Sequence, residues 1–285
     1  MGVELDPGNG STMGPYRQII LFGDSLIEQS GNQLYVHDDG KRSYGFAFLP
    51  AVQNLMVRRF DVLNRGFSGY NTAAAKIIIS QFMPKPEQAT VSLIVVFFGA
   101  NDSALRLDTP ENQHVPLSGY KQNLKAIIND STVKIHSPRI LLITPPPIDE
   151  YKLDAGGLSG SRKAEITKQY AEACCEVGTE ENVAVLDLWT EMIRETVGNI
   201  DQSGVPGSKT LPQFQKLSAL FTDGLHLSEI GYGLLFKSFT AKLKATWPEL
   251  AEATETECST EFPLWRDAMA SLHAGKTMTP RSYRI

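Results

Sequence analysis

The chain has 285 residues, of which 42% are hydrophobic and 21% are charged; these ordinary globular fractions exclude a largely disordered or fibrous chain. Its 27 Lys and Arg against 32 Asp and Glu give a formal net charge of −5, which argues against nucleic acid or an anionic membrane as a partner, because both attract basic patches. The longest apolar run, residues 91–98, is too short to cross a bilayer, so we expect no stable membrane insertion.

The two ends and the cysteines suggest the domain organisation. Residues 1–14 are small, polar and acidic, with no secretory apolar segment, which predicts a flexible tail and a cytoplasmic protein. One domain is expected over residues 15–247, followed by an extension, residues 248–285, that packs on it. Cys174 and Cys175 are adjacent and Cys258 stands alone, which argues against a disulfide framework and favours reduced thiols.

Apolar patterning predicts strands that alternate with helices. Short apolar or β-branched runs predict five strands, at residues 18–22, 61–64, 91–98, 139–144 and 183–188. Apolar residues at helical spacing predict helices at residues 44–60, 72–82, 118–128, 161–177 and 228–244. Strands joined by helical crossovers form a parallel sheet covered on both faces. The expected fold is therefore α/β, a flavodoxin-like three-layer doubly wound fold with a five-stranded parallel sheet.

Polar, glycine-rich motifs follow the first three predicted strands. They are GDS at residues 23–25, GFSG at 66–69 and GAND at 99–102. In doubly wound sheets, ligands bind beyond the carboxyl ends of the strands, where the strand order reverses. We therefore expect the functional residues to meet at this edge.

Ser25 is the candidate nucleophile, because a serine nucleophile must be exposed, fixed and near a base, and a strand-to-helix turn meets the first two needs. The same tripeptide also fits a simple helix cap. His226 is the candidate base, since Asp223 three residues earlier can hold its Nδ1 hydrogen and leave Nε2 free. Taken alone, that pair fits local loop order at least as well.

An acyl-transfer site also needs donors for the oxyanion, and three candidates converge at the same edge: the backbone N–H groups of Ser25 and Gly69 and the side-chain amide of Asn101. Each one alone fits turn chemistry equally well. No histidines have compact metal-ligand spacing, so no metal is expected. No GxSxG, GxGxxG or Walker A motif occurs, which argues against an ordinary α/β-hydrolase and against a nucleotide cofactor; no cofactor is expected.

Taken together, the blocks FGDSL, NRGFSGYNT, FFGANDS and TDGLHLS occur in order over residues 15–247. This ordered set resembles the SGNH hydrolases, the GDSL esterase/lipase superfamily, whose four letters are here Ser25, Gly69, Asn101 and His226. Residues 61–72, 97–102 and 143–148 look like the isoamyl acetate-hydrolysing esterase subfamily. The resemblance implies Ser25, Asp223 and His226 as catalytic residues and Ser25, Gly69 and Asn101 as the oxyanion hole.

The resemblance implies a serine esterase that hydrolyses short-chain, acetate-type esters through an acyl-enzyme, with a small-molecule ester as its partner. Two alternatives stay open: a carbohydrate O-deacetylase or lysophospholipase/thioesterase on the same machinery, and a flavodoxin-like binding module with a decayed site. The intact Ser25, Asp223 and His226 set disfavours decay. The oligomeric state is left open, a homodimer included. Four long loops are expected to shape the substrate pockets, and long loops at a site often act as lids: residues 26–43, 103–116, 145–160 and 199–220.

Overall fold

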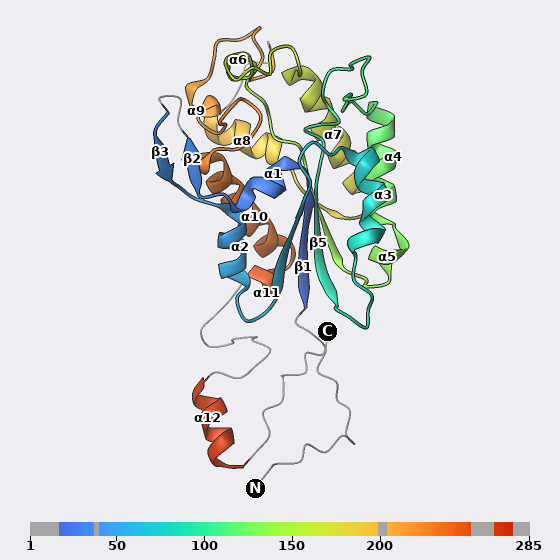
Figure 1. Cartoon of the computed structure of the whole chain (residues 1–285), viewed down its shortest axis with the longest axis vertical. Helices are drawn as coiled ribbons and strands as arrows, with labels where there is room; N and C mark the ends of the chain where they lie inside the picture. Colours follow the sequence, from blue (N-terminus) through green and yellow to red (C-terminus); the bar gives the residue numbers. More distant parts are fainter. Residues whose placement is uncertain (1–16, 37–39, 199–203, 252–264, 276–285) are drawn as a thin grey trace.

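The computed structural model describes residues 17–36, 40–198, 204–251 and 265–275. Its centre is a parallel sheet with the strand order β4-β1-β5-β6-β7 (Figure 1). Along the chain these strands are Gln18–Gly23 (β1), Asp61–Gly66 (β4), Val91–Phe97 (β5), Arg139–Ile143 (β6) and Ala184–Leu186 (β7). The order of the five is thus second, first, third, fourth, fifth, which is that of flavodoxin-like folds and confirms the expected fold.

Different helices bury the two faces of the sheet (Figure 1). One face carries α2 (Phe48–Met56), α8 (Leu188–Thr196) and α10 (Glu229–Thr246); the other carries α3 (Thr72–Phe82), α4 (Leu117–Ile128) and α7 (Ala164–Glu180). Successive strand residues point to opposite faces, so Ile19 and Leu21 join the first core cluster while Ile20 and Phe22 join the second. Since both faces are covered, the central strands are continuous apolar runs.

The helix expected over residues 44–60 is shorter than its pattern indicated. A hairpin of β2 (Leu34–Val36) and β3 (Arg42–Tyr44) comes first, and α2 begins only at Phe48. Tyr44 pairs with Leu34 in this hairpin, and Ala47 before the helix is extended, with φ −126° and ψ 134°. The helix ends at Met56, and Arg58 then takes a left-handed conformation with φ 63°.

Several short elements lie in segments that were expected to be loops. These are α1 (Ser25–Glu28), the 3₁₀ turn η1 (Gln29–Gly31), α5 (Ser131–Lys134), α6 (Glu150–Ala155) and α9 (Gln215–Ser218). Helices of one turn show no apolar periodicity, which is why the patterning did not predict them. The predicted helix 161–177 also lies three residues later in the structure, as α7.

The two ends of the chain are described only in part. The tail expected over residues 1–14 lies outside the described residues. The extension begins with α11 (Pro248–Ala251), whose Leu250 is buried and whose Glu249 Oε1 accepts a hydrogen bond from Arg139 Nη2 at 2.7 Å. Helix α12 (Trp265–His273) has no buried side chain. Residues 252–264 and 276–285 are not described, so packing of the whole extension on the domain stays a prediction.

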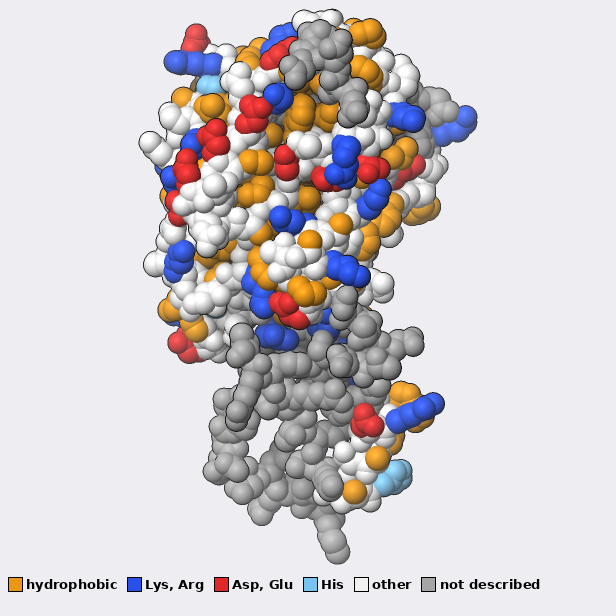
Figure 2. Space-filling view, turned by 180° about the vertical axis from the view of Figure 1, so that it is seen from behind, with side chains coloured by type: hydrophobic (Ala, Val, Ile, Leu, Met, Phe, Trp, Pro, Cys, Tyr) orange, Lys and Arg blue, Asp and Glu red, His pale blue; other side chains and the backbone are white. Residues whose placement is uncertain are grey.

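The described surface carries charges of both signs. On the face shown in Figure 2, basic and acidic side chains are interspersed. One cluster joins Lys121 to Glu176 and Glu180 at 2.9 and 3.0 Å. Among the described residues, no helix has the length and apolar character needed to cross a bilayer.

Candidate active site

Ser25 lies at the turn between β1 and α1, and this turn depends on its neighbours. A Cβ at Gly23 would lie 2.5 Å from Ile27 Cγ1, so the turn has room for glycine only. Asp24 caps α1, because its Oδ1 accepts the backbone N–H of Leu26 at 2.9 Å. Ser25 is the first residue of the helix and is 6% exposed. This turn therefore places Ser25 just beyond the carboxyl end of β1.

Asp223 and His226 lie in the turn that precedes α10. Asp223 Oδ1 accepts the backbone N–H groups of Leu225 at 3.0 Å and of His226 at 2.8 Å. Gly224 has φ 89°, and a Cβ there would lie 2.5 Å from the carbonyl oxygen of Asp149. The turn therefore needs glycine at that position, and it bends the two flanking side chains toward each other.

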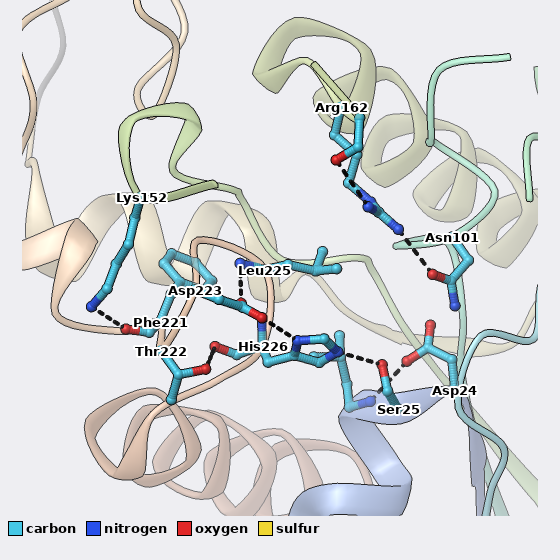
Figure 3. Close-up of polar contacts among 12 residues, drawn as sticks. Asp24, Ser25, Asn101, Lys152, Arg162, Phe221, Thr222, Asp223, Leu225 and His226 are labelled. Atoms are coloured by element: carbon cyan, nitrogen blue, oxygen red, sulfur yellow. Dashed lines mark hydrogen bonds and ion pairs between the residues drawn. The ribbon is translucent and has the colours of Figure 1, made fainter. Parts of the chain in front are cut away.

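The structure brings Ser25, His226 and Asp223 together as a continuous chain of hydrogen bonds (Figure 3). Nε2 of His226 lies 3.0 Å from Ser25 Oγ, across 201 positions of sequence. Nδ1 of His226 lies 2.7 Å from Asp223 Oδ2. Since a carboxylate only accepts, it assigns the hydrogen of a neutral imidazole to Nδ1, and Nε2 then accepts the serine O–H.

The charge state of Asp223 is set by its hydrogen bonds. Partial burial raises the pKa of this carboxyl, but the hydrogen bonds from the His226 ring and from the backbone of His226 and Leu225 outweigh burial and lower it to about 2. Asp223 is therefore a carboxylate at neutral pH. It can stabilise a positive charge on the imidazole of His226.

Asn101 follows β5 and is 4% exposed. Both ends of its amide are engaged: Oδ1 accepts a hydrogen bond from Arg162 Nη2 at 3.0 Å, and Nδ2 donates to the carbonyl oxygen of Tyr70 at 2.9 Å. An amide nitrogen carries two hydrogens, and among the described residues the second has no acceptor. Figure 3 shows this amide above Asp24, beside the pair of Ser25 and His226.

Gly69 lies in the loop after β4, next to the end of β1. Gly66 pairs with Gly23 in the parallel register, and the N–H of Phe67 donates to the Gly23 carbonyl at 2.9 Å. Gly69 itself has φ 79°, a conformation that favours glycine. Because the next residue, Tyr70, binds Asn101, the loop of Gly69 and the loop of Asn101 are joined at the expected edge.

Two buried carboxyls lie beneath these loops. Burial is the main cause that raises the pKa of Asp24 to about 7 and that of Asp102 to about 6. Asp102 accepts hydrogen bonds from the N–H of Thr72 at 3.0 Å and from its hydroxyl, which anchors the loop that carries Asn101. Oδ2 of Asp24 has no hydrogen-bond partner among the described residues.

Two side chains that the sequence patterns did not single out contact the predicted site. Arg162, 5% exposed, binds Asn101 from 61 positions away, and Gln113 Nε2 donates to the carbonyl oxygen of Gly69 at 3.0 Å. Gln113 stands in a polar segment between predicted elements and Arg162 at the start of the helix predicted over residues 161–177, and no motif marks either residue. Only their proximity in space distinguishes them from other loop residues.

Two other histidines contact backbone carbonyl oxygens. His114 Nδ1 lies 2.9 Å from the carbonyl oxygen of Ala104, and His136 Nε2 lies 2.8 Å from that of Pro84. His37 falls outside the described residues. Within the part of the chain that the structure describes, no three His, Cys, Asp or Glu side chains are grouped so as to hold a metal ion. The expectation of no metal stays a prediction from the sequence.

Comparison with known proteins gives the family. Residues 19–239 match the family model of the GDSL-like lipases/acylhydrolases. The chain belongs to this family. It is 34% identical to the human isoamyl acetate-hydrolyzing esterase 1 homolog over 88% of the chain and 87% of that protein. It is 35% identical to a GDSL esterase/lipase of Arabidopsis thaliana over 80% of the chain and 86% of that protein.

Solved structures agree with this assignment. A lipase/acylhydrolase from Enterococcus faecalis is 25% identical with a TM-score of 0.53, covering 80% of this chain and 96% of that one. An acetylxylan esterase from Geobacillus stearothermophilus is 18% identical with a TM-score of 0.56, covering 85% of this chain and 99% of that one, and it shares the fold. The GDSL family member described here is thus an esterase-type hydrolase, as the ordered motifs predicted.

Proposed function

We propose that the protein is a serine esterase that hydrolyses short-chain, acetate-type esters through an acyl-enzyme on Ser25. The observation that carries the proposal is the continuous hydrogen-bond chain from Ser25 Oγ through both ring nitrogens of His226 to Asp223. A serine hydroxyl is a weak nucleophile until a neighbouring base takes its proton. His226 Nε2 is placed to take that proton, and the carboxylate of Asp223 is placed to stabilise the resulting cation.

In the acylation half-reaction, Ser25 Oγ attacks the ester carbonyl carbon while its proton moves to His226 Nε2. The carbonyl oxygen becomes an oxyanion, for which the N–H groups of Ser25 and Gly69 and the second amide hydrogen of Asn101 are the proposed donors. Collapse of this intermediate breaks the bond to the alcohol oxygen. His226 gives its proton to the departing alkoxide, and the acyl group stays on Ser25.

In the deacylation half-reaction, water takes the place of the alcohol. His226 removes a proton from this water as it attacks the acyl carbon, and the same donors stabilise the second oxyanion. Collapse releases the carboxylic acid and returns the proton to Ser25. Each step uses only the groups that the acylation step uses, as microscopic reversibility requires.

The acyl group is proposed to be short because relatives at 34–36% identity are named for the hydrolysis of isoamyl acetate. The fold neighbour named an acetylxylan esterase acts on an acetyl ester of a carbohydrate. This neighbour supports carbohydrate O-deacetylation as the second candidate function, which would use the same acyl group and a different alcohol.

A rate panel tests the proposal: p-nitrophenyl acetate, butyrate and octanoate, isoamyl acetate, acetylated xylooligosaccharides, a lysophospholipid and an acyl thioester. We expect the highest kcat/KM on acetate esters of small alcohols. A fluorophosphonate should label Ser25 in the same preparation. Faster hydrolysis of the sugar acetates would favour the second candidate. Hydrolysis of no ester, with Ser25 unlabelled, would support a binding module and overturn the proposal.

We also infer that the protein works in a reducing compartment such as the cytoplasm. Among the described residues, Cys174 and Cys175 are free thiols, and Cys258 lies outside them. Burial raises the pKa of the Cys175 thiol to about 11, which keeps it protonated and unreactive. Fractionation of cells that make the tagged protein tests the location.

A further inference from the structure

We infer that Arg162 and Gln113 are positioning residues of the oxyanion hole, which hold the Asn101 amide and the Gly69 loop in one fixed arrangement. The inference rests on the proposed function and goes beyond it, since neither residue belongs to the hydrogen-bond chain of Ser25, His226 and Asp223. The geometry that carries it is a ring of hydrogen bonds that passes through both side chains.

Arg162 makes one edge of this ring. Its Nη2 donates to Asn101 Oδ1 at 3.0 Å (Figure 3) and to Gln113 Oε1 at 3.4 Å. Its Nε donates to the carbonyl oxygen of Ala100 at 2.9 Å. One guanidinium thus binds both the backbone and the side chain of the loop that carries Asn101. Because Oδ1 is held by Arg162, Nδ2 of Asn101 must point the opposite way.

Gln113 closes the ring on the other side. Its Oε1 faces Arg162, so its Nε2 faces the Gly69 loop and donates to the carbonyl oxygen of Gly69. Asn101 Nδ2 donates to the carbonyl oxygen of Tyr70, the next residue of that loop. Two successive carbonyls of one loop are therefore held by two amides, and both amides are oriented by one guanidinium. This arrangement fixes the loop of Gly69 relative to Asn101.

The charge of Arg162 adds to the positional effect. Burial lowers the pKa of its guanidinium, while the charges of Asp24 and Asp223 oppose that shift, and an arginine stays charged in proteins. Among the described residues, no carboxylate forms an ion pair with Arg162, and its hydrogen-bond acceptors are neutral oxygens. A cation bound to an amide oxygen polarises the amide and makes its N–H a stronger donor. That effect favours a developing oxyanion more than a neutral substrate carbonyl.

A second buried arginine offers a matched comparison. Arg59 is 2% exposed, and its guanidinium donates to the carbonyl oxygen of Leu55 at 2.6 Å, at the end of α2 and the amino-terminal side of the sheet. It also contacts the carbonyl oxygen of Glu249 in α11. Arg59 therefore holds the fold at the edge opposite Ser25. Replacement of each arginine by lysine separates an effect on the site from the general cost of changing a buried arginine.

The experiment measures kcat, KM and melting temperature for Arg162→Lys, Gln113→Met and Arg59→Lys, with active sites counted by fluorophosphonate. Lysine keeps the charge but cannot form the planar fork of arginine. We expect kcat to fall about 10–100-fold in Arg162→Lys and about 3–10-fold in Gln113→Met, with KM changed by less than about threefold, because the lost stabilisation belongs to the transition state. Arg59→Lys should lower the melting temperature and leave kcat within about twofold.

A double-mutant cycle identifies the route of the effect. If Arg162 acts through Asn101, Arg162→Lys should cost less than about twofold in an Asn101→Ala background. Gln113→Met should keep part of its cost there, because Gln113 binds the carbonyl oxygen of Gly69 directly. The affinity of an alkylboronic acid, which forms a tetrahedral adduct with a serine nucleophile, should fall in parallel with kcat/KM in the single variants. Equal losses in both backgrounds, or a kcat per labelled site that stays at the wild-type value, would overturn the inference.

Two outcomes keep this test separate from that of the proposed function. If the wild-type protein hydrolyses no ester and Ser25 takes no label, the proposed function fails. If the wild type is active and the Arg162 and Gln113 variants match it, only the inference fails. Should Arg162→Lys not fold, Gln113→Met decides the inference through its kcat per labelled site, because it changes a half-buried loop side chain.

Discussion

Ser25 and Asn101 lie beyond the carboxyl ends of two buried strands and are themselves buried, whereas Asp223 and His226, on the turn before α10, are half-buried. The sheet holds the first pair through packed backbone. The second pair is held by a tight turn in which one carboxylate binds two backbone N–H groups. The proposed nucleophile and the proposed oxyanion donor are thus buried beside the sheet, while the proposed base lies in a half-buried turn.

Asp24 and Asp223, the acids of these two regions, have pKa values that shift in opposite directions. Burial raises the pKa of Asp24 to about 7, because one of its oxygens lies in the core without a hydrogen-bond partner among the described residues. In Asp223 three hydrogen bonds outweigh partial burial and lower the pKa to about 2. Burial alone favours a neutral carboxyl, and hydrogen-bond donors favour a carboxylate. The proposed base, His226, needs the carboxylate of Asp223, whereas the turn at Ser25 tolerates a neutral Asp24.

The largest expected effect comes from removing the proposed nucleophile. Ser25→Ala should lower kcat by about 10⁴–10⁶ and leave the melting temperature near that of the wild type, because the fold does not depend on the hydroxyl. Mass spectrometry after treatment with an organophosphate should locate the adduct on Ser25. An adduct on Ser68 or Ser103, with full activity in Ser25→Ala, contradicts the assignment.

In the half-buried turn before α10, Asp223→Asn should lower kcat by about 10²–10⁴. The amide keeps the size of the side chain but loses the negative charge that stabilises the imidazolium and fixes its tautomer. Circular dichroism on the same sample checks that the turn before α10 still folds. A kcat within tenfold of the wild type would show that another group orients His226.

The next prediction concerns the proposed oxyanion donor. Asn101→Ala should lower kcat by about 10²–10³ with little change in KM, which corresponds to about 3–4 kcal/mol of transition-state stabilisation. Asn101→Asp should be worse, since a carboxylate repels the oxyanion. A purely structural role for Asn101 predicts the reverse pattern, a lower melting temperature with near-normal kcat in the folded fraction. Measuring both quantities on one preparation separates the two roles.

The last expected effect concerns the stability of the fold rather than the rate, and it comes from the buried acid Asp24. The pKa of Asp24 is about 7 in the folded protein against an ordinary value of 3.8. Its contribution to stability is therefore complete below about pH 4 and is lost as pH rises to about 7, because only the unfolded chain ionises in that window. Asp24→Asn keeps the cap of α1 but cannot ionise. The free energy of unfolding of Asp24→Asn minus that of the wild type should therefore increase with pH, by up to about 1.4 kcal/mol per pH unit between pH 4 and 7.

Denaturant unfolding at pH 4.5, 5.5, 6.5 and 7.5 measures this difference. Asp130→Asn is the matched control, since Asp130 also caps a helix by accepting a backbone N–H but is only partly buried. Its difference from the wild type measures the cost of changing a helix cap that is only partly buried. Asp223 has the opposite sign: its contribution is present above about pH 4 and is lost as pH falls through about 2. A pH-independent difference for Asp24→Asn would contradict the raised pKa.

The sheet and the positions of the proposed catalytic residues could be predicted from the sequence for a local reason. A parallel strand covered on both faces must be apolar along its whole length, so β1, β5 and β6 are visible as continuous runs. In a doubly wound fold their carboxyl ends share one edge, which places Ser25 and Asn101 together. The tight turn from Asp223 to His226 is equally local, since glycine lies between them in the left-handed region.

Contacts between distant loops were decided only by the tertiary structure. The start of α2 follows a hairpin in which residues 42–44 pair with residues 34–36, and no apolar pattern within residues 44–60 contains that pairing. The ring through Arg162 and Gln113 likewise joins segments that stand 61 and 49 positions apart from their partners. Apolar periodicity records which face of an element is buried. Which polar side chains meet across loops depends on how the finished sheet and its helices place those loops in space.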